Sequence, residues 1–186
     1  MAFPQARDPS WVRLATLVTL ATVAVVVARF GLNPQTPAFC YLAAVGVPLA
    51  FIDVREYRLP DVLTLPSYPA CLLLLGVAAP FLPGGTGRFV HALIGMAAAA
   101  ALFFLLLLAF PAGIGMGDVK LAGPLGAYLG WLGATAFVAG LMAAWLLAAV
   151  TGLGLMAAGR ATRKTQLPFG PFLIIGAFLV ILASTF

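Results

Sequence analysis

The stretch FVHALIGMAAAAALFFLLLLAF, residues 89–110, decides the fold class of this chain. It contains no Asp, Glu, Lys or Arg, and its apolar residues do not alternate with polar ones as they would in a membrane β-strand. A helix needs about 20 mostly apolar residues to cross the hydrocarbon core of a bilayer. Only helices and closed barrels satisfy the backbone there. The stretch therefore predicts a transmembrane helix.

The rest of the chain has the same character. Of its 186 residues, 63% are hydrophobic and only 8% are charged, whereas soluble domains are about 45–50% apolar and about 25% charged. A water-soluble body of this size could not bury so much apolar surface, so lipid must be part of its solvent. The predicted fold class is all-α: one membrane-embedded domain over residues 1–186, in a polytopic bundle of six to seven transmembrane helices.

Charged residues, prolines and glycines divide the apolar sequence into these helices. The piece after Asp118 is the shortest, and the count is six or seven depending on whether that piece crosses fully. The predicted spans are residues 11–30, 38–52, 62–82, 89–110, 118–130, 133–158 and 168–186, and the connections include a charged loop over 53–60, a Gly-rich turn over 83–87, a loop over 111–117 and a basic loop over 159–166.

The cations predict how the bundle is oriented. If the N-terminus is cytoplasmic and all seven pieces cross, only Arg29 and Arg88 of the ten cations lie outside. Cytoplasmic loops of membrane proteins carry such an excess of Lys and Arg. All five acidic residues also fall on the cytoplasmic side. The cations on that side are Arg7, Arg13, Arg55, Arg58, Lys120, Arg160, Arg163 and Lys164.

The net charge of +5 is scattered over short loops. This distribution favours membrane topology and contacts with anionic lipids, and not the binding of nucleic acid. The two cysteines, Cys40 and Cys71, lie in apolar stretches without CxxC spacing, so neither a metal site nor a disulfide is expected.

Two acids stand at ends of apolar runs: Asp53 closes one and Asp118 opens another, on the same membrane face in this topology. An ionisable group at the edge of hydrocarbon is costly and so points to function. Two carboxyl groups held together in a poorly hydrated site cannot both ionise easily, and they share a proton. Such a pair can hydrolyse a peptide, since one acid activates water while the other polarises the carbonyl. The alternative is that both are ordinary loop or cap acids, Asp118 being a suitable N-cap.

The residues around the two acids oppose that alternative. Asp118 lies in Gly115-Met116-Gly117-Asp118-Val119-Lys120, where glycines permit close approach of another backbone, such as the helix end that carries Asp53. Asp53 opens the stretch DVREYRLPDVLTLP, residues 53–66, in which Pro60 and Asp61 suit the start of a helix.

Together these segments resemble the type IV prepilin peptidases, bacterial membrane aspartic proteases of the GxGD type. In that family the first catalytic Asp precedes a basic Leu/Ile-Pro-Asp/Asn-x-Leu-Thr-x-Pro stretch, and the second belongs to Gly-x-Gly-Asp-x-Lys. Asp53 and Asp118 occupy those positions. Residues 167–172, LPFGPF, are also similar to the start of the family's last helix. The resemblance covers the chain from about Ala38 onward.

The resemblance implies an aspartic endopeptidase that needs no cofactor or metal. It would remove the basic leader of prepilin-like precursors, after a glycine, at the cytoplasmic face of the bacterial inner membrane. Bifunctional members also carry an N-terminal CxxC segment linked to N-methylation, which this sequence does not contain, so the resemblance is to a peptidase-only form. The implied catalytic residues are Asp53 and Asp118, and the residues implied to bind substrate or shape the site are Gly115, Gly117, Lys120, Pro60 and Asp61.

Two other classes of function remain open: a proton-coupled transporter with the acids as a relay, and a non-catalytic scaffold of a pilus or secretion system. Within the peptidase reading, Asp61 is the alternative to Asp53, although the family accepts Asn at its position. Lys120 either tunes the acids or contacts substrate, or it only marks the cytoplasmic side. His91 is expected to be structural. The motifs specify neither the particular precursor nor the oligomeric state.

Overall fold

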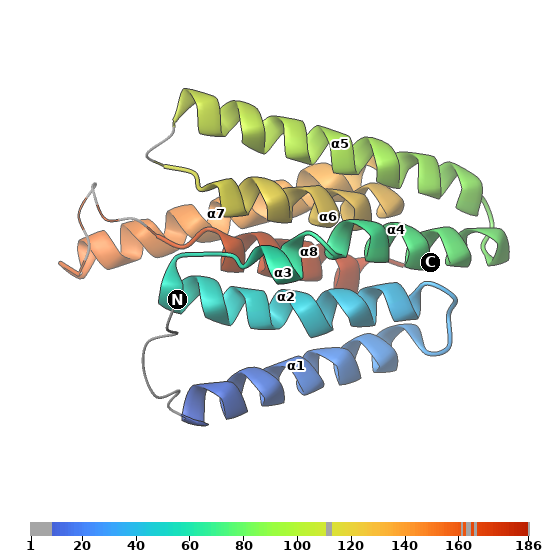
Figure 1. Ribbon diagram of the computed structural model, residues 1–186, viewed down its shortest axis with the longest axis horizontal. Coiled ribbons are helices and arrows are strands. Elements are labelled where there is room, and N and C mark those ends of the chain that lie inside the picture. Colours follow the sequence, from blue (N-terminus) through green and yellow to red (C-terminus); the bar gives the residue numbers. More distant parts are fainter. Residues whose placement is uncertain (1–8, 111–112, 161, 163–164, 166, 186) are drawn as a thin grey trace.

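The computed structural model describes residues 9–110, 113–160, 162, 165 and 167–185, and within these ranges every regular element is a helix. The helices run along the long axis of the molecule in alternating directions (Figure 1). The prediction of an all-α bundle is confirmed. The elements are α1 (Pro9–Phe30), α2 (Thr36–Glu56), α3 (Asp61–Thr64), α4 (Ser67–Ala78), the 3-10 turn η1 (Ala79–Phe81), α5 (Gly85–Ala109), α6 (Met116–Leu132), α7 (Ala134–Ala157) and α8 (Gly170–Ala183).

Five segments of the described chain are long and apolar enough to cross a membrane. They are Ser10–Phe30, Thr36–Glu56, Asp61–Phe81, Gly85–Ala109 and Ala134–Ala157, and the apolar helix α8 is shorter. Large hydrophobic side chains are exposed along their outer faces, as lipid contact requires. The chain is therefore an integral membrane protein.

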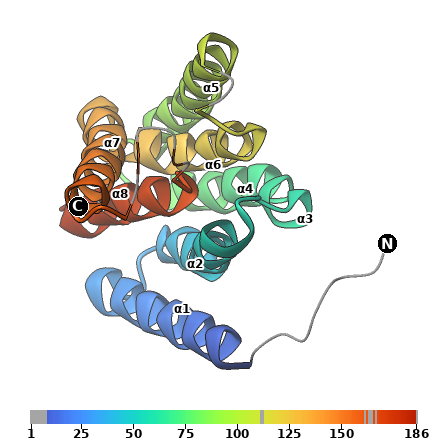
Figure 2. The ribbon, with the colours of Figure 1, turned by 90° about the vertical axis from the view of Figure 1, so that its left-hand side faces the viewer.

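The helix α6 lies at the centre of the bundle. Seen from one end, α4, α5, α7 and α8 surround it, while α1 packs at the periphery against α2 (Figure 2). Every residue of α6 from Leu121 to Trp131 is buried, which is typical of a helix that is apolar all round. The closest packing is on α5, where a Cβ added at Gly95, Gly126 or Gly130 would collide with the facing backbone. Small residues therefore let these two helices touch.

The end of α2 differs from the prediction. Residues 53–60 were expected to form a loop, but α2 continues through Asp53 to Glu56. The helix stops at Tyr57, which adopts a left-handed conformation (φ 50) and donates its N–H to the Asp53 carbonyl at 2.9 Å. Nothing in residues 54–56 breaks a helix, so charge alone was a poor boundary signal here. Asp53 is consequently held on a helix and not on a loop.

Other predicted boundaries shift for similar reasons. The span predicted at 62–82 is broken into α3, α4 and η1, with Pro66 at the first break, because proline lacks an N–H. The Gly-rich turn at 83–87 is shorter than predicted, since α5 already begins at Gly85. α6 begins at Met116, before Asp118, and α8 runs only from Gly170 to Ala183. Parts of the predicted connections and ends lie outside the described residues: Arg7, Asp8, Pro111, Arg163, Lys164, Gln166 and Phe186.

The alternating helices give the bundle two ends. The acid end, at the left of Figure 1, gathers the ends of α2, α5 and α7 and the starts of α3, α6 and α8. The opposite end gathers the starts of α2, α5 and α7 and the ends of α1, α6 and α8. Among the described cations, Arg29 and Arg88 belong to the opposite end, and the acid end holds Arg13, Arg55, Arg58, Lys120 and Arg160.

Candidate active site

Asp53 lies in the last turn of α2, and only 5% of its surface is exposed. Its Oδ2 accepts a hydrogen bond of 3.0 Å from the backbone N–H of Gly170, the first residue of α8. The carboxyl group therefore joins the end of one helix to the start of another, far away in the chain. A free N–H at a helix N-terminus favours a neighbouring anion.

Asp118 lies in the first turn of α6 and is 9% exposed. It is not the N-cap, as one interpretation of the sequence had it. The N-cap is Gly115, and Asp118 reaches back three residues so that its Oδ2 accepts the Gly115 N–H at 3.1 Å. This is the acidic half of a capping box. The start of α6 thus fixes the carboxyl group from its own side.

Asp118 lies outside the five membrane spans, and its pKa depends on the charge of Asp53. Burial raises the pKa of Asp118 to about 6, the Gly115 hydrogen bond lowers it by less, and the charge of Asp53 raises it. The two carboxyl groups are therefore close enough to interact through space. Mutual repulsion and poor hydration favour a state in which one acid is protonated and the other ionised.

Glycine makes room for Asp53 at the start of α8. A Cβ added at Gly170 would lie 2.7 Å from Asp53 Oδ2, so a side chain at this position would displace the carboxyl group. Gly170 belongs to the LPFGPF motif, but sequence reasoning did not single it out as a site residue. The proximity of that motif to Asp53 emerges only from the packing of α8 against α2.

Gly115 and Gly117, the two glycines that precede Asp118, have different surroundings. A Cβ added at Gly117 would lie 3.0 Å from the Cβ of Leu59, so Gly117 lets the connection between α2 and α3 lie against α6. The close approach expected at this motif is found, although the facing residue is Leu59 and not the end of α2. At Gly115 an added Cβ would make only an ordinary contact of 3.6 Å with Asp118 Oδ2.

Lys120 and Asp61 form an ion pair, with Nζ 2.7 Å from Oδ1 and side chains 30% and 56% exposed. The pair ties α3 to α6 beside the acids. Pro60 precedes α3, and its carbonyl accepts the N–H groups of Leu63 and Thr64. The structure therefore brings all the predicted site residues to the acid end, where Lys120 contacts Asp61.

The other residues considered from the sequence are one histidine and two cysteines. His91 is exposed on α5 at the opposite end. Cys40 and Cys71 are free thiols, Cys71 being fully buried. Within the described ranges, no three His, Cys, Asp or Glu side chains gather in a way that could hold a metal ion.

The fold and the site define a class: an integral membrane protein in which two buried acids from different helices interact at one end of the bundle. Comparison with known sequences gives the family. A sequence model described as the type IV leader peptidase family matches residues 39–184. Because this match covers most of the chain, the chain belongs to that family, as the motifs predicted.

Individual relatives agree. The prepilin leader peptidase/N-methyltransferase of Aeromonas hydrophila is 34% identical over 95% of this chain and 58% of its own length. That of Burkholderia pseudomallei (strain 1026b) is 35% identical over 92% of this chain and 54% of its own length. That of Pseudomonas aeruginosa is 31% identical over 89% of this chain and 57% of its own length. The chain therefore spans little more than half the length of these relatives. No solved structure matches it.

Proposed function

We propose that this protein is an aspartic endopeptidase that removes the basic leader from prepilin-like precursors at the cytoplasmic face of the bacterial inner membrane. The observation that carries the proposal is the pairing of Asp53 with Asp118: both are buried, they come from different helices, and the charge of one raises the pKa of the other. A family of leader peptidases supplies the substrate class.

The pair acts with one proton between its two carboxyl groups, and the titration belongs to the pair. The ionised carboxylate takes a proton from a water molecule, whose oxygen attacks the carbonyl carbon of the scissile peptide bond. The protonated carboxyl group donates its proton to the carbonyl oxygen. When the tetrahedral intermediate collapses, the amide nitrogen leaves with the proton held by the first acid, and a hydroxyl group of the intermediate returns its proton to the second acid. The pair then again holds one proton.

Each acid is held in place by one backbone N–H group. Asp53 accepts the Gly170 N–H from the start of α8, and Asp118 accepts the Gly115 N–H at the start of α6. Asp118 has a pKa raised to about 6, mainly by burial. Either carboxyl group can hold the single proton of the resting pair while the other acts as the base.

The location at one end of the bundle suits the proposed substrate. A precursor cut just before its membrane-spanning helix presents the bond at the bilayer edge, where water reaches the acids. Because a helical carbonyl is already hydrogen-bonded, the bond must unwind and lie extended against the enzyme backbone. Gly115 is exposed beside Asp118, and Gly117 lets Leu59 pack against the start of α6. Pro60 and the Lys120–Asp61 pair hold the connection between α2 and α3 in place. These five residues shape the substrate site.

Co-expression tests the proposal. A prepilin-like precursor is produced in bacteria without their own leader peptidase, together with the wild-type protein, Asp53→Asn or Asp118→Asn, each quantified in membranes. Wild type should convert the precursor, and both variants should leave it intact. Maturation by either variant would overturn the assignment of the pair. A scaffold or a proton-coupled transporter would leave the precursor uncut even with the wild-type protein.

A further inference from the structure

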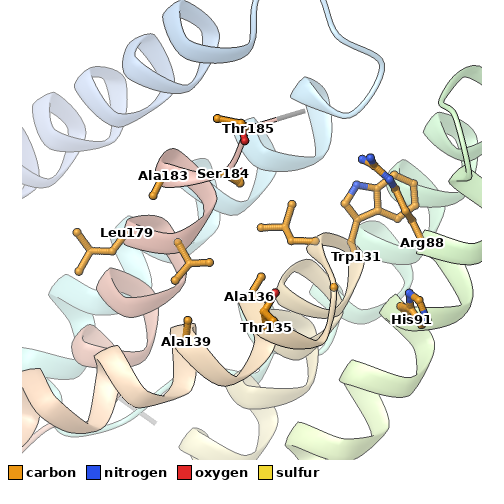
Figure 3. A pocket seen from close by; sticks show the side chains of 13 residues that line it. Arg88, His91, Trp131, Thr135, Ala136, Ala139, Leu179, Ala183, Ser184 and Thr185 are labelled. Atoms are coloured by element: carbon orange, nitrogen blue, oxygen red, sulfur yellow. The ribbon is translucent and has the colours of Figure 1, made fainter.

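The two ends of α8 have different surroundings. The end of the helix, at Ala183 and Ser184, borders a cavity of about 540 Å³ together with the start of α5 and the turn between α6 and α7 (Figure 3). The start of the helix instead contacts Asp53 of α2 and aromatic rings of α5 and α7. The start of α8 is therefore the part of this helix that can act on the acids.

The group that bonds Asp53 is the peptide group between Phe169 and Gly170. Its N–H, on Gly170, donates to Asp53 Oδ2 at 3.0 Å in a buried position. Its carbonyl oxygen, on Phe169, accepts the N–H groups of Phe172 and Leu173 at 3.1 and 3.2 Å. Because a peptide group is planar and rigid, the direction of the N–H follows from the placement of Phe169. Whatever holds Phe169 therefore aims this N–H at the carboxyl group.

Phe169 is held by two further aromatic rings. Its ring centroid lies 5.2 Å from that of Trp145 on α7 and 5.9 Å from that of Phe103 on α5. The rings of Phe103 and Trp145 are themselves 6.4 Å apart. Aromatic rings attract one another at separations of about 4.5–7 Å. Phe103, Trp145 and Phe169, called here the aromatic cluster, thus join the start of α8 to α5 and α7.

Exclusion of water does not account for the aromatic cluster. Phe103 is fully buried and Phe169 is half-buried, but Trp145 is 39% exposed on α7, one of the five membrane spans. Lipid tails are as apolar as leucine side chains, so packing within a membrane is not driven by the hydrophobic effect. The contribution of the three rings is therefore a fixed position for Phe169.

A shift of Phe169 would not be compensated by a neighbouring donor. The residue after Gly170 is Pro171, which has no N–H. The first two residues of α8 consequently offer a single donor to Asp53, that of Gly170. The placement of the carboxyl group thus depends on one peptide group.

We propose that Phe169 and Trp145 are positioning residues of the acid pair. Together with Phe103 they fix the peptide group whose N–H, on Gly170, holds the Asp53 carboxyl group in place. The effect on the reaction rests on the proposed peptidase function, whereas the anchoring of Gly170 can be measured without substrate.

Steady-state cleavage of a synthetic prepilin by the purified full-length protein in detergent tests the effect on the reaction. Phe169→Leu and Trp145→Leu remove a ring but keep an apolar side chain. Each should lower kcat about tenfold and change KM by less than about twofold, because a misplaced acid slows the chemical step. Trp145→Phe keeps a ring and should retain most of the rate. Phe104→Leu, the matched control, removes a 45% exposed ring next to Phe103 and should leave kcat unchanged.

Combination with Gly170→Ala separates positioning from general packing. The added Cβ already displaces the Asp53 carboxyl group, so Phe169→Leu should lower kcat by less than about twofold in this background. A purely structural loss would lower kcat by the same factor in both backgrounds. Trp145→Leu, at a partly exposed position, covers the case in which Phe169→Leu does not fold.

Hydrogen exchange of the Gly170 amide, followed by NMR of glycine-labelled protein in micelles, tests the anchoring without substrate. Phe169→Leu and Trp145→Leu should speed this exchange about tenfold or more, and Phe104→Leu should not change it. Wild-type kcat in both leucine variants, a change in KM alone, equal factors in the two backgrounds, or unchanged exchange at Gly170 would each overturn the proposal. Failure of the wild-type protein to cleave would instead refute the proposed function, and the exchange rates would still decide whether the cluster anchors Gly170.

Discussion

Side chains at the two ends of α2, including its N-cap residue Gln35, interact with side chains of α6, and these two meetings differ in kind. At the opposite end Trp131 Nε1 donates to Gln35 Oε1 at 2.7 Å, with both residues buried. At the acid end the same two helices hold Asp53 and Asp118. Each carboxyl group accepts a backbone N–H, and the charge of Asp53 raises the pKa of Asp118. The Gln35–Trp131 pair is neutral, whereas the Asp53–Asp118 pair can carry charge.

The difference separates a structural polar pair from a functional one. A buried N–H and oxygen that satisfy each other stabilise the fold modestly. Two buried acids cost free energy, since the ionised form loses hydration and meets a like charge. A bundle that only needed to join α2 to α6 could use a neutral pair at both ends. Retaining acids at one end therefore points to chemistry there.

The largest expected effect is the loss of cleavage on removal of either acid. Asp53→Asn and Asp118→Asn should each reduce kcat/KM by about 10³-fold or more, because each acid has its own role in proton transfer. The thermal unfolding midpoint in detergent should not fall in either variant. Gln35→Met should show the reverse pattern, with unfolding at lower temperature and nearly normal cleavage. Normal cleavage by either Asn variant would show that the pair of acids is not functional, and that it does not differ from the Gln35–Trp131 pair in this respect.

A substitution that displaces the Asp53 carboxyl group without removing it should reduce cleavage by a smaller factor. In Gly170→Ala the new Cβ would lie 2.7 Å from Asp53 Oδ2 and push the carboxyl group aside. We expect cleavage to fall by about 10- to 100-fold, because misplacement by about 1 Å has such effects. Gly154→Ala is the matched control, since a Cβ there meets nothing within 4 Å. Equal activity in both variants would show that Gly170 does not position the acid.

The two meetings should also respond differently to pH. Burial raises the pKa of Asp118 from about 4 to about 6, so the folded state binds more protons than the unfolded state between these values. The free energy of unfolding should therefore fall as pH rises from 4 to 6, by about 3 kcal/mol at about 1.4 kcal/mol per pH unit, and stay level above. Asp118→Asn removes this fall, so its advantage over wild type should grow across that window. A pH-independent difference would argue against a buried, coupled Asp118.

At the Gln35–Trp131 pair, the loss of stability on substitution comes from a buried N–H that loses its acceptor. Gln35→Met keeps the length of the side chain but leaves the buried Trp131 N–H without its acceptor. Such a loss costs about 1–3 kcal/mol. Reversible unfolding in mixed micelles measures it, and its size should not change between pH 4 and 7. A variant as stable as wild type would show that the hydrogen bond contributes nothing.

The smallest effect is expected at the ion pair beside the acids. Lys120→Ala breaks a partly exposed pair, which contributes about 0.2–1 kcal/mol to stability. Cleavage should fall only about two- to fivefold, as the connection between α2 and α3 loosens, and Asp61→Asn should behave in the same way. Abolition of cleavage by Asp61→Asn alone would instead make Asp61 a proton carrier in place of Asp53.

The sequence predicted the fold class and both acids because each leaves a strong local signal. Apolar runs long enough to cross a bilayer reveal the helices, and motifs mark Asp53 and Asp118. It misplaced the end of α2, because a charged residue in a last helical turn resembles the start of a loop. It did not pair Lys120 with Asp61 or Gly170 with Asp53, since both contacts depend on how α3 and α8 pack. Contacts between distant helices leave no spacing pattern in one sequence.

Cleavage of a purified, synthetic prepilin by the purified protein in detergent tests the central claim most directly. Because no pilus assembly and no ion gradient is present, only a peptidase can produce a shortened product. We predict that wild type releases the leader as one fragment, and that Asp53→Asn and Asp118→Asn, shown to be folded by the same unfolding assay, release none. Intact substrate with folded wild-type protein, or release of the leader by either variant, would contradict the account.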